Sequence, residues 1–152
     1  MRRFSVLFVV LSVLMVMFAP AALAAPPSGV EITVDVDIAA VSGDFTATGP
    51  AVANGLLCPA GSATGVFVGD TGEGRRFTTF TVDYTFECDD ESGAAVLRLN
   101  VWLDRSTGRT FALWRATGGE GDYVGLRGRG WLVGTPTLPG QIEDVYHGWL
   151  RF

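Results

Sequence analysis

The sequence predicts an all-β protein that folds as a closed antiparallel eight-stranded β-barrel. Eight segments alternate polar and apolar residues with the period of a strand, and the connections between them are short. No segment longer than a turn shows convincing helical periodicity. Closing the sheet would remove its unpaired edges, and an eight-stranded barrel can be filled by side chains or hold one small ligand.

The predicted strands differ in how cleanly they alternate. Residues 30–38 place five apolar residues on one side and four polar residues on the other, as in a half-buried strand. Asp35 and Asp37 share its polar side, which we interpret as solvent-facing and not as a metal or acid–base site. Residues 77–88 form the longest clean strand. The eight candidates are residues 30–38, 45–48, 61–68, 77–88, 94–104, 109–116, 131–133 and 142–152.

The sixth candidate strand, residues 109–116, is apolar on both sides. Phe111 and Leu113 alternate with Ala112 and Trp114. An antiparallel strand with two apolar faces needs a cover on both of them. The sequence leaves two covers open, namely a second protomer or a flap formed by the irregular connection 51–60.

A glycine-dense stretch, residues 118–130, lies between two apolar strand-like runs. Glycine reaches positive φ at low cost and lets another backbone or a ring approach closely. We interpret the stretch as a tight corner followed by a sharply coiled strand, which barrel curvature requires. The motif residues are Gly118, Gly119, Gly121, Tyr123, Gly125, Gly128 and Gly130.

The first 24 residues have the pattern of a secretory signal peptide. Arg2 and Arg3 precede an apolar run, and Ala22-Leu23-Ala24 is an A-x-A cleavage site. Cleavage would leave one barrel domain, residues 25–152, as a secreted protein with no membrane association. Its nine arginines and 16 acidic residues give a net charge of −7, and the chain has no lysine. This balance argues against nucleic-acid partners.

The chain has two cysteines, Cys58 and Cys88. An even count in an exported protein predicts one disulfide, worth roughly 3–4 kcal/mol in the chain-entropy model. The alternatives are a metal site or a catalytic thiol, for which a single histidine and the lack of C-x-x-C spacing leave little support. We therefore expect no metal and no cofactor.

The stretch from Gly118 to Gly128 also resembles the G-G-x-G-x-(aromatic)-x-G-x-x-G signature of the allene oxide cyclase barrel and of dirigent proteins. Asp144-Val145-Tyr146-His147-Gly148, Gly49-Pro50 and the cysteine pair resemble small exported bacterial proteins of that barrel type. The resemblance implies an eight-stranded, often oligomeric barrel with an apolar cavity. Plant members of the wider group cyclise an unsaturated epoxide or steer radical coupling. Their pocket residues match no positions here, so no catalytic residue is carried over.

The sequence supports three functions, which we rank. The first is a non-enzymatic barrel that binds a small apolar ligand or a partner protein, including a second copy. The second is a cyclase-like or dirigent-like catalyst whose cavity holds a reactive substrate in a folded shape, with Asp83 and Asp104 among its conceivable polar groups. The third is a structural protein with a filled barrel. His147 is interpreted as a non-catalytic strand residue. Candidate cavity residues are Tyr84, Arg98, Asn100, Trp102 and Trp114.

Overall fold

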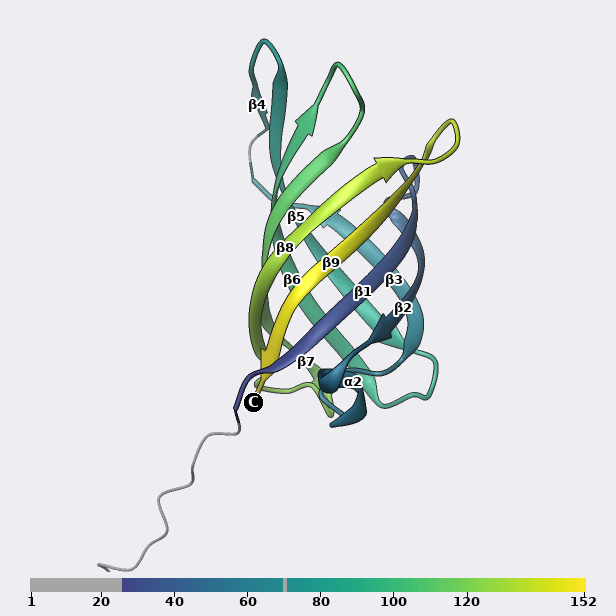
Figure 1. Cartoon of the computed structure of the whole chain (residues 1–152), viewed down its shortest axis with the longest axis vertical. Coiled ribbons are helices and arrows are strands. Elements are labelled where there is room, and N and C mark those ends of the chain that lie inside the picture. The colour runs from purple at the N-terminus through teal and green to yellow at the C-terminus, as the bar shows by residue number, and fades with distance from the viewer. Residues whose placement is uncertain (1–25, 70) are drawn as a thin grey trace, which may run out of the picture.

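The computed structural model describes residues 26–69 and 71–152, and the predicted signal peptide lies outside the described residues. The described chain is nearly all strand (Figure 1). Its elements are β1 (Ser28–Asp37), β2 (Ser42–Thr48), α2 (Pro50–Ala53), β3 (Ala60–Phe67), β4 (Gly72–Glu73), β5 (Phe77–Cys88), β6 (Gly93–Asp104), β7 (Thr110–Gly121), β8 (Arg127–Pro136) and β9 (Gln141–Arg151).

Eight of the strands form a closed antiparallel barrel, as the sequence predicts. The sheet runs in the order β3-β2-β1-β9-β8-β7-β6-β5, and pairing between β3 and β5 closes the ring. The remaining strand, β4, pairs with β5 alone and extends as a hairpin beyond the barrel (Figure 1). The sequence analysis missed β4 and α2, because two and four residues are too few to show a period.

The interior is built by one parity of each strand. On β6, Leu97, Leu99 and Val101 point inward and are buried. The middle of the barrel is filled by aromatic rings, and the ring of Phe86 lies edge-on to those of Phe45 and Tyr146, at centroid distances of 5.2 and 5.7 Å. Edge-to-face packing of this kind adds about 1 kcal/mol per pair to the burial of the rings.

The glycine-dense stretch closes one end of the barrel. In this stretch β7 ends at Gly121, the chain turns, and β8 begins at Arg127. Tyr123 and Leu126, in the turn that connects the two strands, are buried. Gly121 and Gly125 adopt φ of +61° and +85°, which side-chain-bearing residues rarely adopt. The predicted corner and the coiled strand that follows it are both present.

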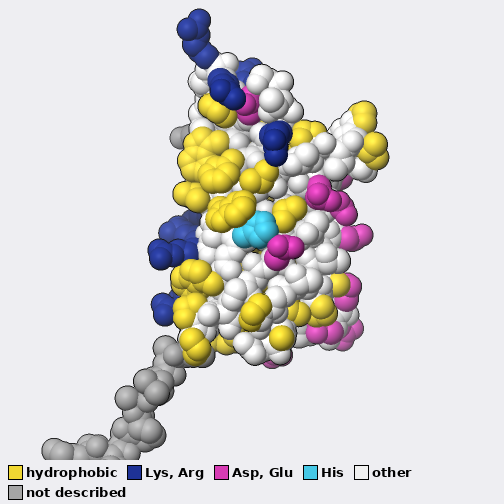
Figure 2. Space-filling model, in the orientation of Figure 1, with side chains coloured by type: hydrophobic (Ala, Val, Ile, Leu, Met, Phe, Trp, Pro, Cys, Tyr) yellow, Lys and Arg dark blue, Asp and Glu magenta, His cyan; other side chains and the backbone are white. Residues whose placement is uncertain are grey.

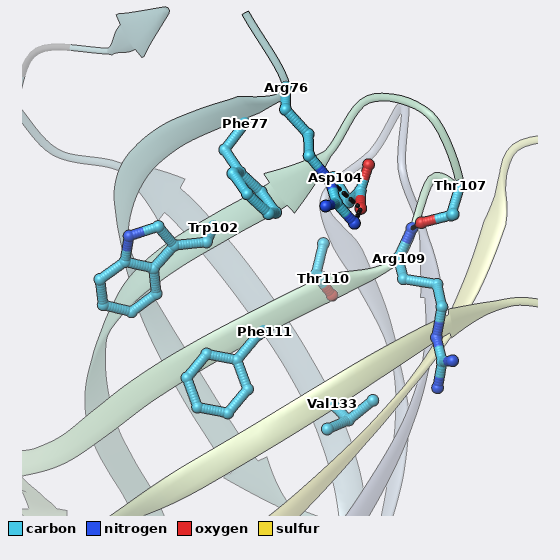
Figure 3. Close-up of a pocket in the computed structure, with 9 residues that line it drawn as sticks. All are labelled: Arg76, Phe77, Trp102, Asp104, Thr107, Arg109, Thr110, Phe111 and Val133. Carbon is cyan, nitrogen blue, oxygen red and sulfur yellow. Dashed lines mark hydrogen bonds and ion pairs between the residues drawn. The ribbon is translucent and has the colours of Figure 1, made fainter. Parts of the chain in front are cut away.

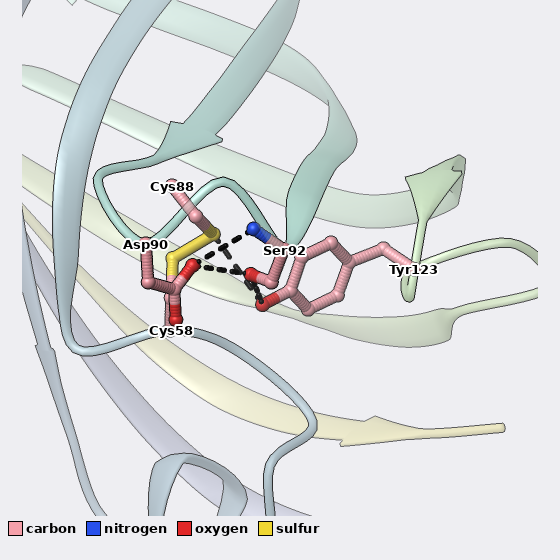
Figure 4. Close-up of a disulfide and its surroundings, with 5 residues drawn as sticks. All are labelled: Cys58, Cys88, Asp90, Ser92 and Tyr123. Atoms are coloured by element: carbon pink, nitrogen blue, oxygen red, sulfur yellow. Dashed lines mark hydrogen bonds between the residues drawn. A yellow bond between two sulfur atoms is a disulfide. The ribbon is translucent and has the colours of Figure 1, made fainter.

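The predicted disulfide is confirmed and lies at the same closed end. Cys58, just after α2, bonds to Cys88 at the end of β5, with 5.9 Å between the Cα atoms. The hydroxyl of Tyr123 lies 3.4 Å from the Sγ of Cys88 and 2.9 Å from the Oγ of Ser92 (Figure 4). Asp90 in turn accepts a hydrogen bond from that Ser92 hydroxyl. The closed end is thus locked by a covalent bond and a connected set of polar contacts.

The structure shows that one of the two covers expected for β7 is wrong. The connection 51–60 lies across the barrel end, where α2 packs against β1, β2 and β9, with Ala51 and Leu57 buried. It therefore leaves the outer face of β7 uncovered. The side chains of Phe111 and Leu113 on that face are 45% and 50% exposed.

Candidate functional site

The interior contains a cavity of about 130 Å³ toward the end of the barrel opposite the disulfide. Its walls are aliphatic and aromatic, and exposed apolar residues, Ile38 and Phe67, form part of its rim. We call it the open-end cavity. Its inner wall includes Val36, Phe80, Val82, Leu99, Val101 and Leu132.

One carboxyl group, that of Asp144, lies in this apolar cavity. Asp144 is on the inward parity of β9 and is 7% exposed. Thr110 of β7, Gly134 of β8 and Asp144 lie in one row across the three strands. The Thr110 hydroxyl donates to Asp144 Oδ1 at 3.3 Å. A side chain at Gly134 would collide with both groups, so the glycine makes room for them to meet.

Burial changes the acidity of this group and of its neighbours. Desolvation raises the pKa of Asp144 to about 6, and the hydrogen bond from Thr110 offsets only part of that effect. The pKa of Tyr84 and that of Tyr146 are raised by burial and, secondly, by the charge of Asp144. The Tyr146 hydroxyl is fully buried and has no hydrogen-bond partner among the described residues. The cavity thus contains a buried carboxyl and the ring of Tyr84 in apolar surroundings, with Tyr146 close enough to feel the charge of Asp144.

The five residues proposed from the sequence to line a cavity divide between the two faces of the barrel. Tyr84 points inward and lines the open-end cavity. Trp114 also points inward, but its ring lies against Gly130 and Gly148, and its Nε1 donates to the carbonyl of Trp131 at 3.2 Å. It therefore fills space that two glycines leave free. The other three, Arg98, Asn100 and Trp102, share the outward parity of β6 and do not line the open-end cavity.

The charged candidates on the outer face form ion pairs there. Arg98 donates to both carboxylate oxygens of Asp83, at 2.7 and 2.6 Å, and this hydrogen bonding lowers the pKa of Asp83. Arg76 donates to Asp104, whose pKa is lowered to about 2 by that bond and then by Ser106. Each of these carboxylates is held ionised by an arginine, unlike Asp144.

A second feature is an aromatic and arginine-rich area on the outside of β6–β9, which we call the outer face. Cross-strand pairing places Leu113, Trp131 and His147 in one row. An adjacent row contains arginines, and the guanidinium of Arg129 lies 5.7 Å from the ring of Trp149. Figure 2 shows hydrophobic side chains gathered on this side, arginines at one edge and acidic residues at the other.

Two shallow grooves lie on the outer face. One, of about 570 Å³, is lined by Phe77, Trp102, Phe111 and Val133 and ends at the Arg76–Asp104 pair (Figure 3). The other, of about 630 Å³, lies between Trp131 and Trp149. Both are larger than the open-end cavity but wide open to solvent, and among the described residues that line them no side chain has a buried polar atom without a partner. The open-end cavity is therefore the better candidate for a small-molecule site.

The sequence analysis missed two polar residues of the cavity, Thr110 and Asp144, and the nearby Tyr146. One signal was available for Asp144. It shares its strand parity with Ile142, Tyr146 and Leu150, so a carboxyl group stands among residues that face the core. A charged residue on the apolar side of a strand is a marker of a functional site.

Two observations bear on metal ions and membranes. Within residues 26–69 and 71–152, no three His, Cys, Asp or Glu side chains lie close enough together to hold a metal ion. No helix in the described part of the chain is long and apolar enough to cross a membrane.

His147 lies outside the barrel, where its Nδ1 is 3.3 Å from a carboxylate oxygen of Glu31.

Comparisons with protein-family models, with curated proteins and with solved structures found no match. The barrel itself is shown by the strand pairing. The likeness of the glycine motif to allene oxide cyclase and dirigent barrels stays a prediction.

Proposed function

We propose that this protein is a secreted barrel that binds a small, mainly apolar molecule in the open-end cavity. An apolar protein cavity of about 150 Å³ is known to bind benzene, so a volume of about 130 Å³ suits a ligand with one six-membered ring. A long-chain lipid would not fit unless most of it stayed outside. The apolar rim residues, Ile38 and Phe67, offer such a ligand a path of entry.

The observation that carries this proposal is the buried carboxyl of Asp144. Its pKa of about 6 means that keeping it ionised at neutral pH costs up to about 3 kcal/mol. A packed, purely structural interior gains nothing from such a group. A binding site does, because one polar anchor in an apolar cavity fixes the orientation of a ligand.

A cavity-filling variant tests the proposal. Benzyl alcohol, which has a ring and one hydroxyl, should produce saturable NMR shifts at residues around the open end. Val101→Phe should abolish them by filling the cavity, whereas Val145→Phe, on the outer side of β9, should leave them unchanged. Shifts confined to the outer face, or none, would count against binding in the cavity.

A second candidate function is binding of a partner protein at the outer face. Trp131 and Leu113 are 44% and 50% exposed, and tryptophan and arginine are enriched at binding hot spots. The arginines favour a partner with an acidic surface. If the partner is a second copy, light scattering of the purified protein should give the mass of a dimer. Trp131→Ser should then shift the measured mass toward that of the monomer. Retention of the dimer mass would exclude this face.

Catalysis in the same cavity is the third candidate. A carboxyl group with a pKa near 6 is suited to proton transfer at neutral pH, and the hydroxyl of Tyr84 could hold an oxygen of the substrate. This candidate needs turnover as evidence, so binding of a ligand without conversion would favour the first proposal.

A further inference from the structure

Asp144 has no ion-pair partner among the described residues, unlike Asp83 and Asp104. The ion pairs among the described residues join Arg76 to Asp104 and Arg98 to Asp83, and the Nδ1 of His147 lies 3.3 Å from Glu31. None includes Asp144, which has one hydroxyl contact at 3.3 Å. A buried charge without a partner is costly, and a bound cation would remove most of that cost.

The groups that face Asp144 from the neighbouring strands are neutral. β7 contributes Thr110, β8 contributes Gly134, and β5 and β9 contribute Tyr84 and Tyr146. Both tyrosines stay protonated over the ordinary pH range because their pKa values are raised. No arginine among the described residues lines the cavity. Its one negative charge is therefore not balanced from within.

The cavity walls suit a cation with an apolar body. The rings of Phe67 and Phe80 lie edge to face, 5.4 Å between centroids, and both line the cavity together with Tyr84. Aromatic faces attract organic cations, most strongly where water is excluded. A buried carboxylate and aromatic rings that line the same cavity are the two components of an ammonium site.

We infer that the ligand of the open-end cavity is a small organic amine in its protonated form, with its ammonium group on Asp144 and its apolar part against Phe67, Phe80 and Tyr84. This inference rests on the proposed function and specifies the class of ligand. An anionic ligand is disfavoured by the charge of Asp144. A neutral alcohol could donate one hydrogen bond but would leave the carboxylate charge unpaired.

Matched probes of similar size test the class of ligand. Benzylamine, benzyl alcohol, toluene and benzoate share one ring and differ in charge and hydrogen bonding. By isothermal titration at pH 7.5, benzylamine should bind at least tenfold more tightly than benzyl alcohol, and benzoate should bind most weakly. At pH 5 the preference for benzylamine should shrink, because Asp144 is then mostly protonated.

Two variants assign the preference to Asp144. Asp144→Asn should remove the advantage of benzylamine while leaving toluene binding within about twofold. Asp35→Asn makes the same change of charge on the exposed outer side of β1 and should leave the advantage intact. Melting curves of both variants report whether each is folded, and toluene binding reports whether the cavity is intact.

The outcomes separate the inference from the proposed function. If neutral probes bind in the cavity as tightly as benzylamine, the amine is the wrong class and cavity binding stands. If the preference for benzylamine survives Asp144→Asn, Asp144 is not its cause and the inference fails. If none of the four probes binds, both the inference and the proposed function are overturned.

Discussion

The two ends of the barrel treat buried polar groups in opposite ways. At the closed end, the Tyr123 hydroxyl contacts Ser92 and the disulfide sulfur, and Ser92 donates to Asp90. Away from that end, the Asp144 carboxyl accepts one hydrogen bond at 3.3 Å, and the Tyr146 hydroxyl in the middle of the barrel has no partner among the described residues. Satisfied buried groups stabilise a fold, whereas unsatisfied ones cost free energy and are retained where a ligand completes them. The comparison is consistent with our proposal that the closed end stabilises the fold and the open end binds a ligand.

The largest expected effect comes from removing the disulfide. Cys58→Ala together with Cys88→Ala should lower the free energy of unfolding by roughly 3–4 kcal/mol, because the bond closes a loop between residues 30 positions apart. Urea denaturation measures this loss. Under conditions where the variant is folded, benzyl alcohol should bind as it does to the parent protein. A parallel loss of binding would show that the two ends are coupled.

Asp144→Asn should raise the free energy of unfolding, whereas loss of the disulfide lowers it. The pKa of the buried carboxyl is above its unfolded value, so the folded state holds its proton more tightly, and stability falls as the pH rises through about 6. The variant removes that loss and should be more stable than the parent by up to about 3 kcal/mol at pH 7.5. At pH 4 the two should be nearly equal.

The control for this prediction is Asp35→Asn, on the exposed outer side of β1. Its free energy of unfolding should stay within about 0.5 kcal/mol of the parent value at both pH values. Urea denaturation of all three proteins provides the comparison. If Asp144→Asn were less stable than the parent at neutral pH, the carboxylate would have a structural partner, and the open end would lose its contrast with the closed end.

Two glycines near the closed end should respond differently to alanine. A Cβ at Gly128 would meet the Trp149 carbonyl and lie 2.6 Å from Leu150 Cδ2, so Gly128→Ala should cost about 2–3 kcal/mol. Gly125 has open space around it and only its φ of +85° opposes a side chain, so Gly125→Ala should cost about 1 kcal/mol. Thermal melting of the two variants side by side measures the difference. Equal losses would mean that the close contacts at Gly128 relax at little cost, so that interior space is not what requires a glycine there.

The sequence predicted the barrel because its evidence is local. Alternation along residues 30–38 or 142–152 identifies a strand without knowledge of its neighbours, and turn residues limit the connections. The disulfide followed from the number of cysteines. The barrel closes by pairing between β3 and β5. Which two strands close it depends on pairing between distant segments, and no local pattern encodes that.

The site could not be predicted in the same way, because its residues meet only across strands. Thr110, Gly134 and Asp144 are far apart in sequence and form a row only in the register of β7, β8 and β9. Arg98, Asn100 and Trp102 were proposed as cavity residues because they form the polar side of β6. The sequence alone did not decide which side of that strand faces the interior. Leu97 and Leu99 decide it, since burial of their side chains turns the polar parity outward.

The smallest expected effect compares two tyrosine hydroxyls directly. Tyr123→Phe removes a hydroxyl that contacts Ser92 at 2.9 Å, and leaves the Ser92 hydroxyl with Asp90 alone, so it should cost about 1 kcal/mol. Tyr146→Phe removes a buried hydroxyl that has no partner among the described residues, so it should be neutral or stabilise by up to about 1 kcal/mol. Urea denaturation of both variants at the same pH measures the difference. A loss at Tyr146 as large as that at Tyr123 would mean that the Tyr146 hydroxyl is bound by water in solution. The Tyr146 hydroxyl would then be as well satisfied as the polar groups at the closed end, and the case for a ligand would rest on Asp144 alone.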